Sequence, residues 1–332
     1  MPTRRSGRPS AAEPHARATS RLGLDAIAGE SRGIARVRNQ VRQVASTRTS
    51  VLMEGEPGTG KSLVARVIHD LSPHPDEPFV EVICGALAPD LLEGELFGLS
   101  TGKSPGDAGD PGRLERARAG TLFMDEVAAA SPAVQLKLLR ALQEGVFERL
   151  GGRETLKVHA RLVAATERGL EAETRAGRFR QDLLDRLGAV RIAMPPLRQR
   201  LEDIPALVEH FIQASRRDRG RRVTGITRGA LERLSRHPWP GNVGELKNAV
   251  ENMVTHADRG RLDLADLPPW LGEPGNGTEA LRIEVGMTVE EVERRLIEAT
   301  LRYTGNDRRR AATLLGIGLR TLYRKIKQLR LG

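Results

Sequence analysis

The chain has 332 residues, enough for two or three folding units with their own cores, and 53 Lys and Arg against 43 Asp and Glu give it a formal net charge of +10. This charge favours a polyanionic partner, although a solvated basic surface gives the same balance. The single cysteine, Cys84, excludes an internal disulfide, and no apolar run approaches the roughly 18 residues of a membrane helix, so we expect a cytoplasmic protein without a membrane contact.

Residues 1–22 are expected to form a basic, disordered tail. As far as Ser20, four arginines accompany one acid, Glu13, among Pro, Ser and Ala residues that cannot bury enough surface to order the segment. Two interpretations stay open: a solvated tail without a partner, and a tail that contacts DNA.

A phosphate-binding loop is predicted directly after the apolar strand at residues 49–53 and before the amphipathic helix at residues 63–69. Its glycines would let backbone N–H groups turn onto an anion, while Lys61 would reach the β- and γ-phosphates and Ser62 would hold Mg²⁺. The alternative is a glycine-rich turn that binds nothing. The residues assigned to nucleotide binding are Gly55, Glu56, Pro57, Gly58, Thr59, Gly60, Lys61 and Ser62.

Short apolar strands alternate with amphipathic helices between residues 24 and 195, which is typical of an α/β fold with a mostly parallel sheet. The strand at residues 120–124 runs into Asp125 and Glu126. Carboxylates at the carboxyl edge of such a sheet lie where nucleotides bind. Asp125 is therefore a candidate for binding nucleotide and, through water, Mg²⁺, and Glu126 is a candidate catalytic base. Taken alone, an Asp-Glu pair is often only a solvated turn.

Six segments together resemble the AAA+ domain of the sigma-54-dependent transcription activators, also called bacterial enhancer-binding proteins. The resemblance covers residues 24–271. The segments are 95–98 (ELFG), 120–126 (GTLFMDE), 135–145 (QLKLLRALQEG), 179–183 (FRQDL), 195–198 (PPLR) and 239–243 (WPGNV).

The resemblance implies an AAA+ P-loop NTPase with an α/β subdomain at residues 23–200 and a helical lid at residues 201–271. It also implies a ring of subunits with ATP between neighbours, in which Arg180 and Arg186 act as catalytic arginine fingers on the adjacent site. A guanidinium from a second subunit would neutralise charge on the γ-phosphoryl group and make hydrolysis depend on assembly. Without the resemblance, these arginines would be interpreted as surface residues.

This sequence departs from the family pattern at the loop that presses on the sigma factor and at three nucleotide-site positions. Residues 102–107 (GKSPGD) stand where the family carries a Phe and a Thr, so the loop lacks an apolar contact residue. Ile83 and Glu167 each replace an Asn, and Gly244 replaces an Arg that contacts nucleotide. A carboxylate at position 167 would repel a phosphate by about 1–4 kcal/mol unless it is protonated or paired. The changes predict retained binding and weakened or rewired turnover, so whether the chain is an active ATPase stays open.

Beyond a linker at residues 272–279, the last segment, residues 280–332, predicts three short helices that resemble the Fis-type helix-turn-helix domain. From Leu301 onward it carries nine Lys or Arg against one acid. A basic helix after a tight turn is typical of major-groove binding, and paired domains predict a palindromic site on double-stranded DNA. The alternative is a basic bundle that binds protein. The candidate DNA-binding residues are Arg308, Arg309, Arg310, Arg320, Thr321, Arg324, Lys325 and Lys327.

Three functions are compatible with the sequence. The first is an ATP-binding, DNA-binding regulator that couples an oligomeric AAA+ ring to transcription, with or without contact to RNA polymerase carrying sigma-54. The second is a sigma-54-independent regulator that uses nucleotide only as an assembly switch. The third, an AAA+ motor or loader delivered to DNA, is disfavoured by residues 95–98 and by the Fis-type segment. With few residues before the AAA+ segment, the sequence predicts control by a separate protein, by nucleotide or by expression level.

Overall fold

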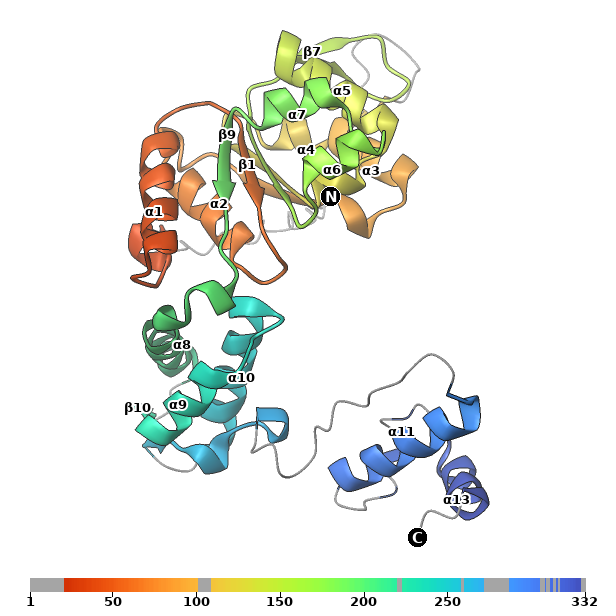
Figure 1. Ribbon diagram of the computed structural model, residues 1–332. Coiled ribbons are helices and arrows are strands. Elements are labelled where there is room, and N and C mark those ends of the chain that lie inside the picture. Colours follow the sequence, from red (N-terminus) through yellow and green to blue (C-terminus); the bar gives the residue numbers. More distant parts are fainter. Residues whose placement is uncertain are drawn as a thin grey trace, which may run out of the picture. The chain divides into compact units, whose positions relative to one another are not determined.

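The computed structural model describes residues 21–100, 109–219, 223–257, 260–271, 287–304 and 317–329, with positions 308, 311, 312 and 315. The chain divides into two compact units, Met1–Arg200 and Leu201–Gly332 (Figure 1). Residues 1–20 of the expected tail, the loop at residues 102–107 and the expected linker at 272–279 lie outside the described residues. Within the described part, no helix combines the length and the apolar composition that crossing a membrane requires.

The first unit is built on a five-stranded sheet whose paired strands all run parallel, as the alternation of strands and helices predicts. Its order is β2-β5-β8-β1-β9, so β1 lies in the interior of the sheet between strands that come later in the chain. The carboxyl ends of these strands therefore meet at one edge. The strands are β1 (Val51–Glu54), β2 (Phe79–Ile83), β5 (Thr121–Asp125), β8 (Arg161–Thr166) and β9 (Val190–Ala193).

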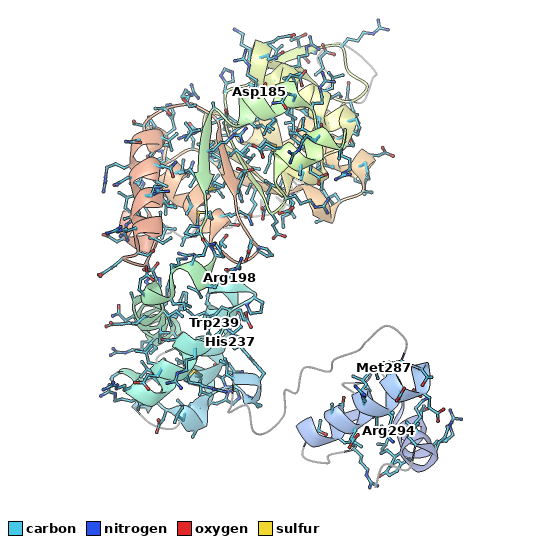
Figure 2. The ribbon with its side chains drawn as sticks, in the orientation of Figure 1. Asp185, Arg198, His237, Trp239, Met287 and Arg294 are labelled. Atoms are coloured by element: carbon cyan, nitrogen blue, oxygen red, sulfur yellow. The ribbon has the colours of Figure 1, made fainter. Side chains whose placement is uncertain are left out.

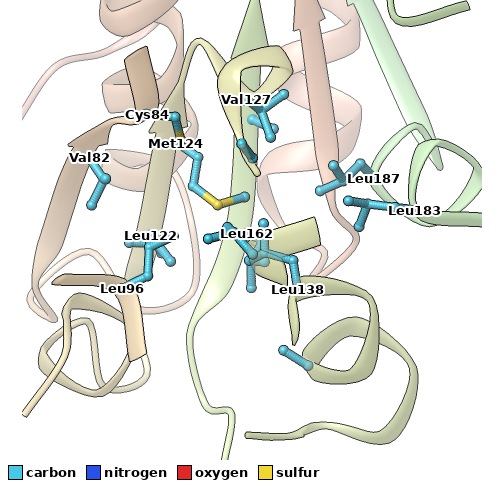
Figure 3. Close-up of a cluster of buried hydrophobic side chains, with 14 of the residues drawn as sticks. Val82, Cys84, Leu96, Leu122, Met124, Val127, Leu138, Leu162, Leu183 and Leu187 are labelled. Carbon is cyan, nitrogen blue, oxygen red and sulfur yellow. The ribbon is translucent and has the colours of Figure 1, made fainter. Parts of the chain in front are cut away.

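Alternate side chains of the central strands enter two different apolar clusters, one on each face of the sheet. Leu122 and Met124 of β5 belong to one cluster, together with Leu162 of β8 (Figure 3). Phe123 and Val163, one residue along, belong to the other. The first cluster includes residues of α3 (Pro89–Phe97), α4 (Arg113–Arg116), α5 (Pro132–Glu144), α6 (Leu170–Arg175) and α7 (Gln181–Leu187), and the second those of α1 (Arg32–Ala45) and α2 (Lys61–Asp70).

Two short antiparallel pairs lie outside the central sheet: β3 (Gly98–Leu99) with β4 (Asp110–Pro111), and β6 (Val146–Glu148) with β7 (Thr155–Lys157). Gly98 has φ of +82°, and a Cβ there would lie 2.6 Å from the carbonyl oxygen of Asp110. Only glycine fits this close approach, which joins the two ends of the segment that contains residues 102–107. These pairs were not predicted, because two- and three-residue strands carry too little periodicity.

In the second unit, α8 (Ile204–Arg219), α9 (Arg228–Arg236) and α10 (Asn242–His256) accompany a parallel pair, β10 (Gly225–Ile226) with β11 (Arg261–Leu262). Trp239 is fully buried, and its Nε1 donates to the Leu234 carbonyl at 2.8 Å. Its ring lies 4.7 Å from that of His237 (Figure 2). These helices lie within the expected helical lid, and α10 buries Leu246, Val250 and Val254 at helical spacing.

The C-terminal segment contains α11 (Val289–Tyr303) and α13 (Leu319–Gln328), which share a small core. Thr288 caps α11, because its Oγ1 accepts the Glu291 N–H at 3.2 Å. The middle helix expected around Ala311 and Leu315 falls partly outside the described residues, although Ala311 and Ala312 are buried against Leu322.

A buried arginine joins β8 to the end of α1. Arg161 is 5% exposed, and its guanidinium donates to the carbonyl oxygens of Val44, Ala45 and Thr49 at 2.9, 3.1 and 3.1 Å. Burial lowers its pKa to about 10, so it stays charged at neutral pH. The cation thus caps the C-terminus of α1 and fixes the start of β1.

We predict that Arg161→Met lowers the free energy of unfolding by about 2–4 kcal/mol, because the hydrogen bonds of a buried guanidinium to three carbonyl groups are lost, two of them in buried surroundings. Urea denaturation measures this loss. The control is Arg48→Met, which removes one exposed hydrogen bond to the His159 carbonyl and is expected to cost less than about 1 kcal/mol. Equal stability of the two variants would contradict the capping role.

Candidate functional site

The loop between β1 and α2 has the shape of an anion cradle. Gly58 and Gly60 have φ of +71° and +103°, a region that favours glycine. A Cβ on Gly55 would lie 2.8 Å from Cβ of Met194 and 2.9 Å from its carbonyl oxygen, so the loop passes too close to the chain after β9 for a larger residue. The loop leads into the N-terminus of the ten-residue helix α2, where N–H groups and the helix dipole favour an anion.

Lys61 is buried at the centre of this loop, with 6% of its surface exposed. Its Nζ donates to the carbonyl oxygens of Gly55 and Glu56 at 2.8 and 3.1 Å. The carboxylate of Glu167 lies 3.9 Å away. A buried ammonium needs such acceptors or an anion to offset its lost hydration, so the cation is held inside the loop.

The acidic pair lies at the carboxyl end of β5, as predicted. Asp125 ends the strand, and Glu126 adopts a left-handed backbone conformation with φ of +54°, which is costly for a residue other than glycine. Asp125 Oδ1 accepts the Glu126 N–H at 3.0 Å, and Glu126 Oε1 accepts the backbone N–H of Glu167 at 3.0 Å. The Glu126 side chain is therefore directed to the end of β8, near Glu167 and hence near Lys61.

The surroundings raise the pKa of Glu126, first through burial and then through the charge of Glu167. Ile83 is in register with Asp125 and is 49% exposed; its apolar side chain can offer Glu126 no hydrogen bond.

Burial, with the charges of Asp125 and Glu126, raises the pKa of the Cys84 thiol to about 12. The thiol stays protonated, so it is unsuited to act as a nucleophile.

Two arginines that follow β9 brace the cradle. Arg198 pairs with Glu56 through two contacts of 2.6 and 2.5 Å, and Arg200 donates to the Thr59 carbonyl at 3.2 Å. In the sequence, Arg198 stands out only as part of the motif at residues 195–198, and Arg200 belongs to no motif. Because these partners are about 140 residues away along the chain, no local pattern indicates the contacts.

The other predicted residues of this site have varied environments. Ser62 is exposed in the first turn of α2. Arg180 and Arg186 are exposed at the two ends of α7, where Arg180 pairs with Asp182 at 2.7 Å. Within the described residues, no group of three or more His, Cys, Asp or Glu is placed to hold a metal ion. Gly244 lies near the start of α10.

The candidate DNA-binding residues are described only in part. Arg324 and Arg308 are exposed, and the Arg308 guanidinium lies 5.2 Å from the ring centre of Tyr323. Lys325, which was expected to face outward, is half-buried and pairs with Glu293 of α11 at 2.5 Å. The described region excludes Arg309, Arg310 and the side chains of Arg320 and Lys327.

Family profiles match the chain in three consecutive segments. The Sigma-54 interaction domain matches residues 27–193, the AAA+ ATPase lid domain residues 198–282, and the Bacterial regulatory protein, Fis family, residues 288–329. The expected family and its order of domains are confirmed.

Individual relatives agree with the profiles. The Nif-specific regulatory protein of Herbaspirillum seropedicae is 48% identical over 233 residues, which cover 70% of this chain and 43% of that protein. The transcriptional regulatory protein ZraR of Salmonella typhimurium is 42% identical over 301 residues, which cover 90% and 68%. NtrX from Brucella abortus, solved in complex with ATP, aligns with a TM-score of 0.69 at 33% identity and covers 92% of this chain and 69% of that one.

The chain thus spans roughly half to two thirds of the length of these relatives. The parallel sheet, the cradle with its buried lysine, and the three profile matches lead to one conclusion. This chain belongs to the family of sigma-54-dependent transcription activators, with an AAA+ domain and a C-terminal Fis-type helix-turn-helix domain.

Proposed function

We propose that the chain binds ATP with Mg²⁺, assembles into a ring, and controls transcription from DNA sites to which its Fis-type domain delivers it. The observation that carries this proposal is the buried Lys61 inside a glycine cradle, beside the carboxylates of Glu126 and Glu167. The NtrX structures in complex with ADP and with ATP support nucleotide as the ligand. A chromosomal target would place this activity in the cytoplasm.

The residues of the cradle fit a nucleotide triphosphate. Backbone N–H groups of residues 55–62 and the Lys61 ammonium would bind the β- and γ-phosphates. Ser62 and Asp125 would hold Mg²⁺, which keeps most of its ligands as water and phosphate oxygens and neutralises phosphate charge. Glu126 would orient the attacking water and accept its proton.

Arg180 and Arg186 would complete the site of a neighbouring subunit. Both are exposed on the described surface, and the partner of Arg180 within this chain is the equally exposed Asp182. An exposed ion pair of this kind contributes little stability, so a phosphate of a second subunit can replace Asp182 at small cost. Hydrolysis would then require assembly.

Glu167 would make the site less favourable for ATP than for ADP. Its carboxylate shares Lys61 with any bound phosphate, and its backbone holds Glu126, which marks the γ-phosphate side of the site. Like charges a few Å apart repel by about 1–4 kcal/mol at effective dielectric constants of 80 to 20. The γ-phosphate, which ADP lacks, carries the charge that this carboxylate opposes.

We predict that Glu167→Gln tightens ATP binding relative to ADP binding by at least about fivefold, because the neutral amide neither repels the γ-phosphate nor competes for Lys61. Calorimetric titration of both nucleotides at low protein concentration measures this ratio. Glu154→Gln, which neutralises an exposed carboxylate between β6 and β7, is the matched control and is expected to leave the ratio unchanged. An unchanged ratio in Glu167→Gln would contradict this electrostatic role.

The C-terminal domain would bind duplex DNA through α13, as a pair of copies on a palindromic site. Arg320, Thr321 and Arg324 are best placed in the sequence for base edges. Arg308, Arg309 and Arg310 would contact phosphates, with support from Lys325 and Lys327. The pairing of Lys325 with Glu293 makes Lys325 the weakest of these assignments.

The sequence of the loop at residues 102–107 affects one part of this proposal, the contact with sigma-54. The family matches favour sigma-54 dependence over the alternative of a regulator that uses nucleotide only as an assembly switch. The loop sequence, without an apolar tip, motivates that alternative. A transcription assay separates the two.

We predict ATP-dependent transcripts from a template that carries a site selected by this protein upstream of a sigma-54 promoter, when polymerase with sigma-54 is present. Lys61→Ala is expected to abolish them by removing the phosphate-binding cation. Arg320→Ala with Arg324→Ala is expected to lower affinity for the site by at least about tenfold while sparing ATP binding. Transcription that is indifferent to sigma-54 and to Lys61→Ala would favour the assembly switch.

A further inference from the structure

Gln135 is a polar residue on the buried face of α5. It is 1% exposed, and its neighbours on that face of the helix, including Val134, Leu138 and Leu139, are buried hydrophobic residues. Nothing in the nucleotide site described above uses it. A buried amide is costly unless its donors and acceptor are satisfied, so its partners indicate what it holds.

Those partners come from two separate segments of the chain. The Gln135 amide nitrogen donates to the Ala130 carbonyl at 2.8 Å and to the Arg178 carbonyl at 2.9 Å. Its amide oxygen accepts the backbone N–H of Arg180 at 2.9 Å. The three bonds use both donors and the acceptor of one side chain.

One of these segments follows Glu126, and the other leads to Arg180. Ala130 follows the 3₁₀ turn Val127–Ala129, which comes directly after Glu126. Arg180 is the N-cap residue of α7, and its backbone N–H is held by Gln135 rather than by the helix. The amide therefore connects the segment that carries the catalytic carboxylate to the residue whose guanidinium would serve the neighbouring site.

A second set of contacts holds the segment that leads to Arg180. Glu173 of α6 accepts two bonds from the Arg178 guanidinium, at 2.6 and 2.9 Å, and its carbonyl accepts the Arg178 N–H at 2.9 Å. Phe179, between the two Gln135 partners, is 3% exposed in the apolar cluster. The hydrogen bonds of Gln135 also reach the Ala130 carbonyl, in the segment after β5.

We propose that Gln135 is a positioning residue, which holds Arg180 in a fixed place relative to the Glu126 segment of its own subunit. The arginine offered to the next subunit then depends on the conformation at the β5 edge, so neighbouring sites are coupled through one buried amide. This inference rests on the proposed action of Arg180 on the adjacent site.

The test is complementation between inactive variants in mixed assemblies. A subunit with Gln135→Met would keep a working nucleotide site but misplace Arg180. A subunit with Lys61→Ala would lose its nucleotide site but keep Arg180 in place. Mixed in equal amounts, they should recover up to about a quarter of the wild-type ATPase rate, since one neighbour pair in four joins an intact Lys61 to an intact Gln135. Gln135→Met mixed with Arg180→Ala should recover nothing, because both variants misplace or lack the same arginine.

Alone, Gln135→Met is expected to lower kcat by at least about tenfold and to leave ATP affinity within about twofold of wild type. The matched control is Gln143→Met, which removes an exposed glutamine from the same helix and should leave kcat unchanged. If Gln135→Met unfolds, Gln135→Asn serves in the same mixtures, because it keeps the amide but is one methylene too short to hold Ala130, Arg178 and Arg180 together.

Two failures are distinguishable. If Arg180→Ala and Lys61→Ala complement each other while neither Gln135 variant complements Lys61→Ala, the arginine acts between subunits and the positioning role of Gln135 is wrong. If Arg180→Ala and Lys61→Ala themselves fail to complement, the proposed shared site is wrong, and the inference falls with it.

Discussion

A buried ammonium group constrains the whole first unit. Lys61 lies inside its loop at 6% exposure, so its charge must be matched by carbonyl oxygens, carboxylates or a bound anion. The structure supplies acceptors from the loop after β1 and a carboxylate partner in Glu167 after β8. Glu126 after β5 adds a negative charge close enough to interact with that of Lys61. A parallel sheet brings such ends to one edge, which is why this architecture suits the site.

Several residues around Lys61 that lie far apart in the sequence are explained by their contacts at this site. Gly55 is required by the approach of Met194, and Arg198 fixes Glu56. Glu126 tolerates an unfavourable backbone conformation because two hydrogen bonds define it. The Ile83 side chain can offer Glu126 no hydrogen bond, and the backbone N–H of Glu167 at the end of β8 holds the Glu126 carboxylate instead.

Local patterns predicted much of this structure. The loop at residues 55–62 and the strand ending in Asp125 carry their signals within a few adjacent residues, and α10 shows its helical period directly. The contacts of Arg198, Gln135 and Glu167 were not predicted, because each joins segments separated by tens of residues or more. Gln135 appeared in the sequence only as the first residue of the motif at residues 135–145. The short pair β3 and β4 left none beyond Gly98.

We infer that two copies of this chain make one catalytic site, and the rate of ATP hydrolysis per subunit, measured against protein concentration, tests this inference. We expect a rate that rises cooperatively with concentration and is abolished by both Lys61→Ala and Glu126→Gln. A rate per subunit that is independent of concentration would contradict a shared site. Tight ATP binding with turnover no faster than that of Glu126→Gln would instead identify a nucleotide-gated scaffold.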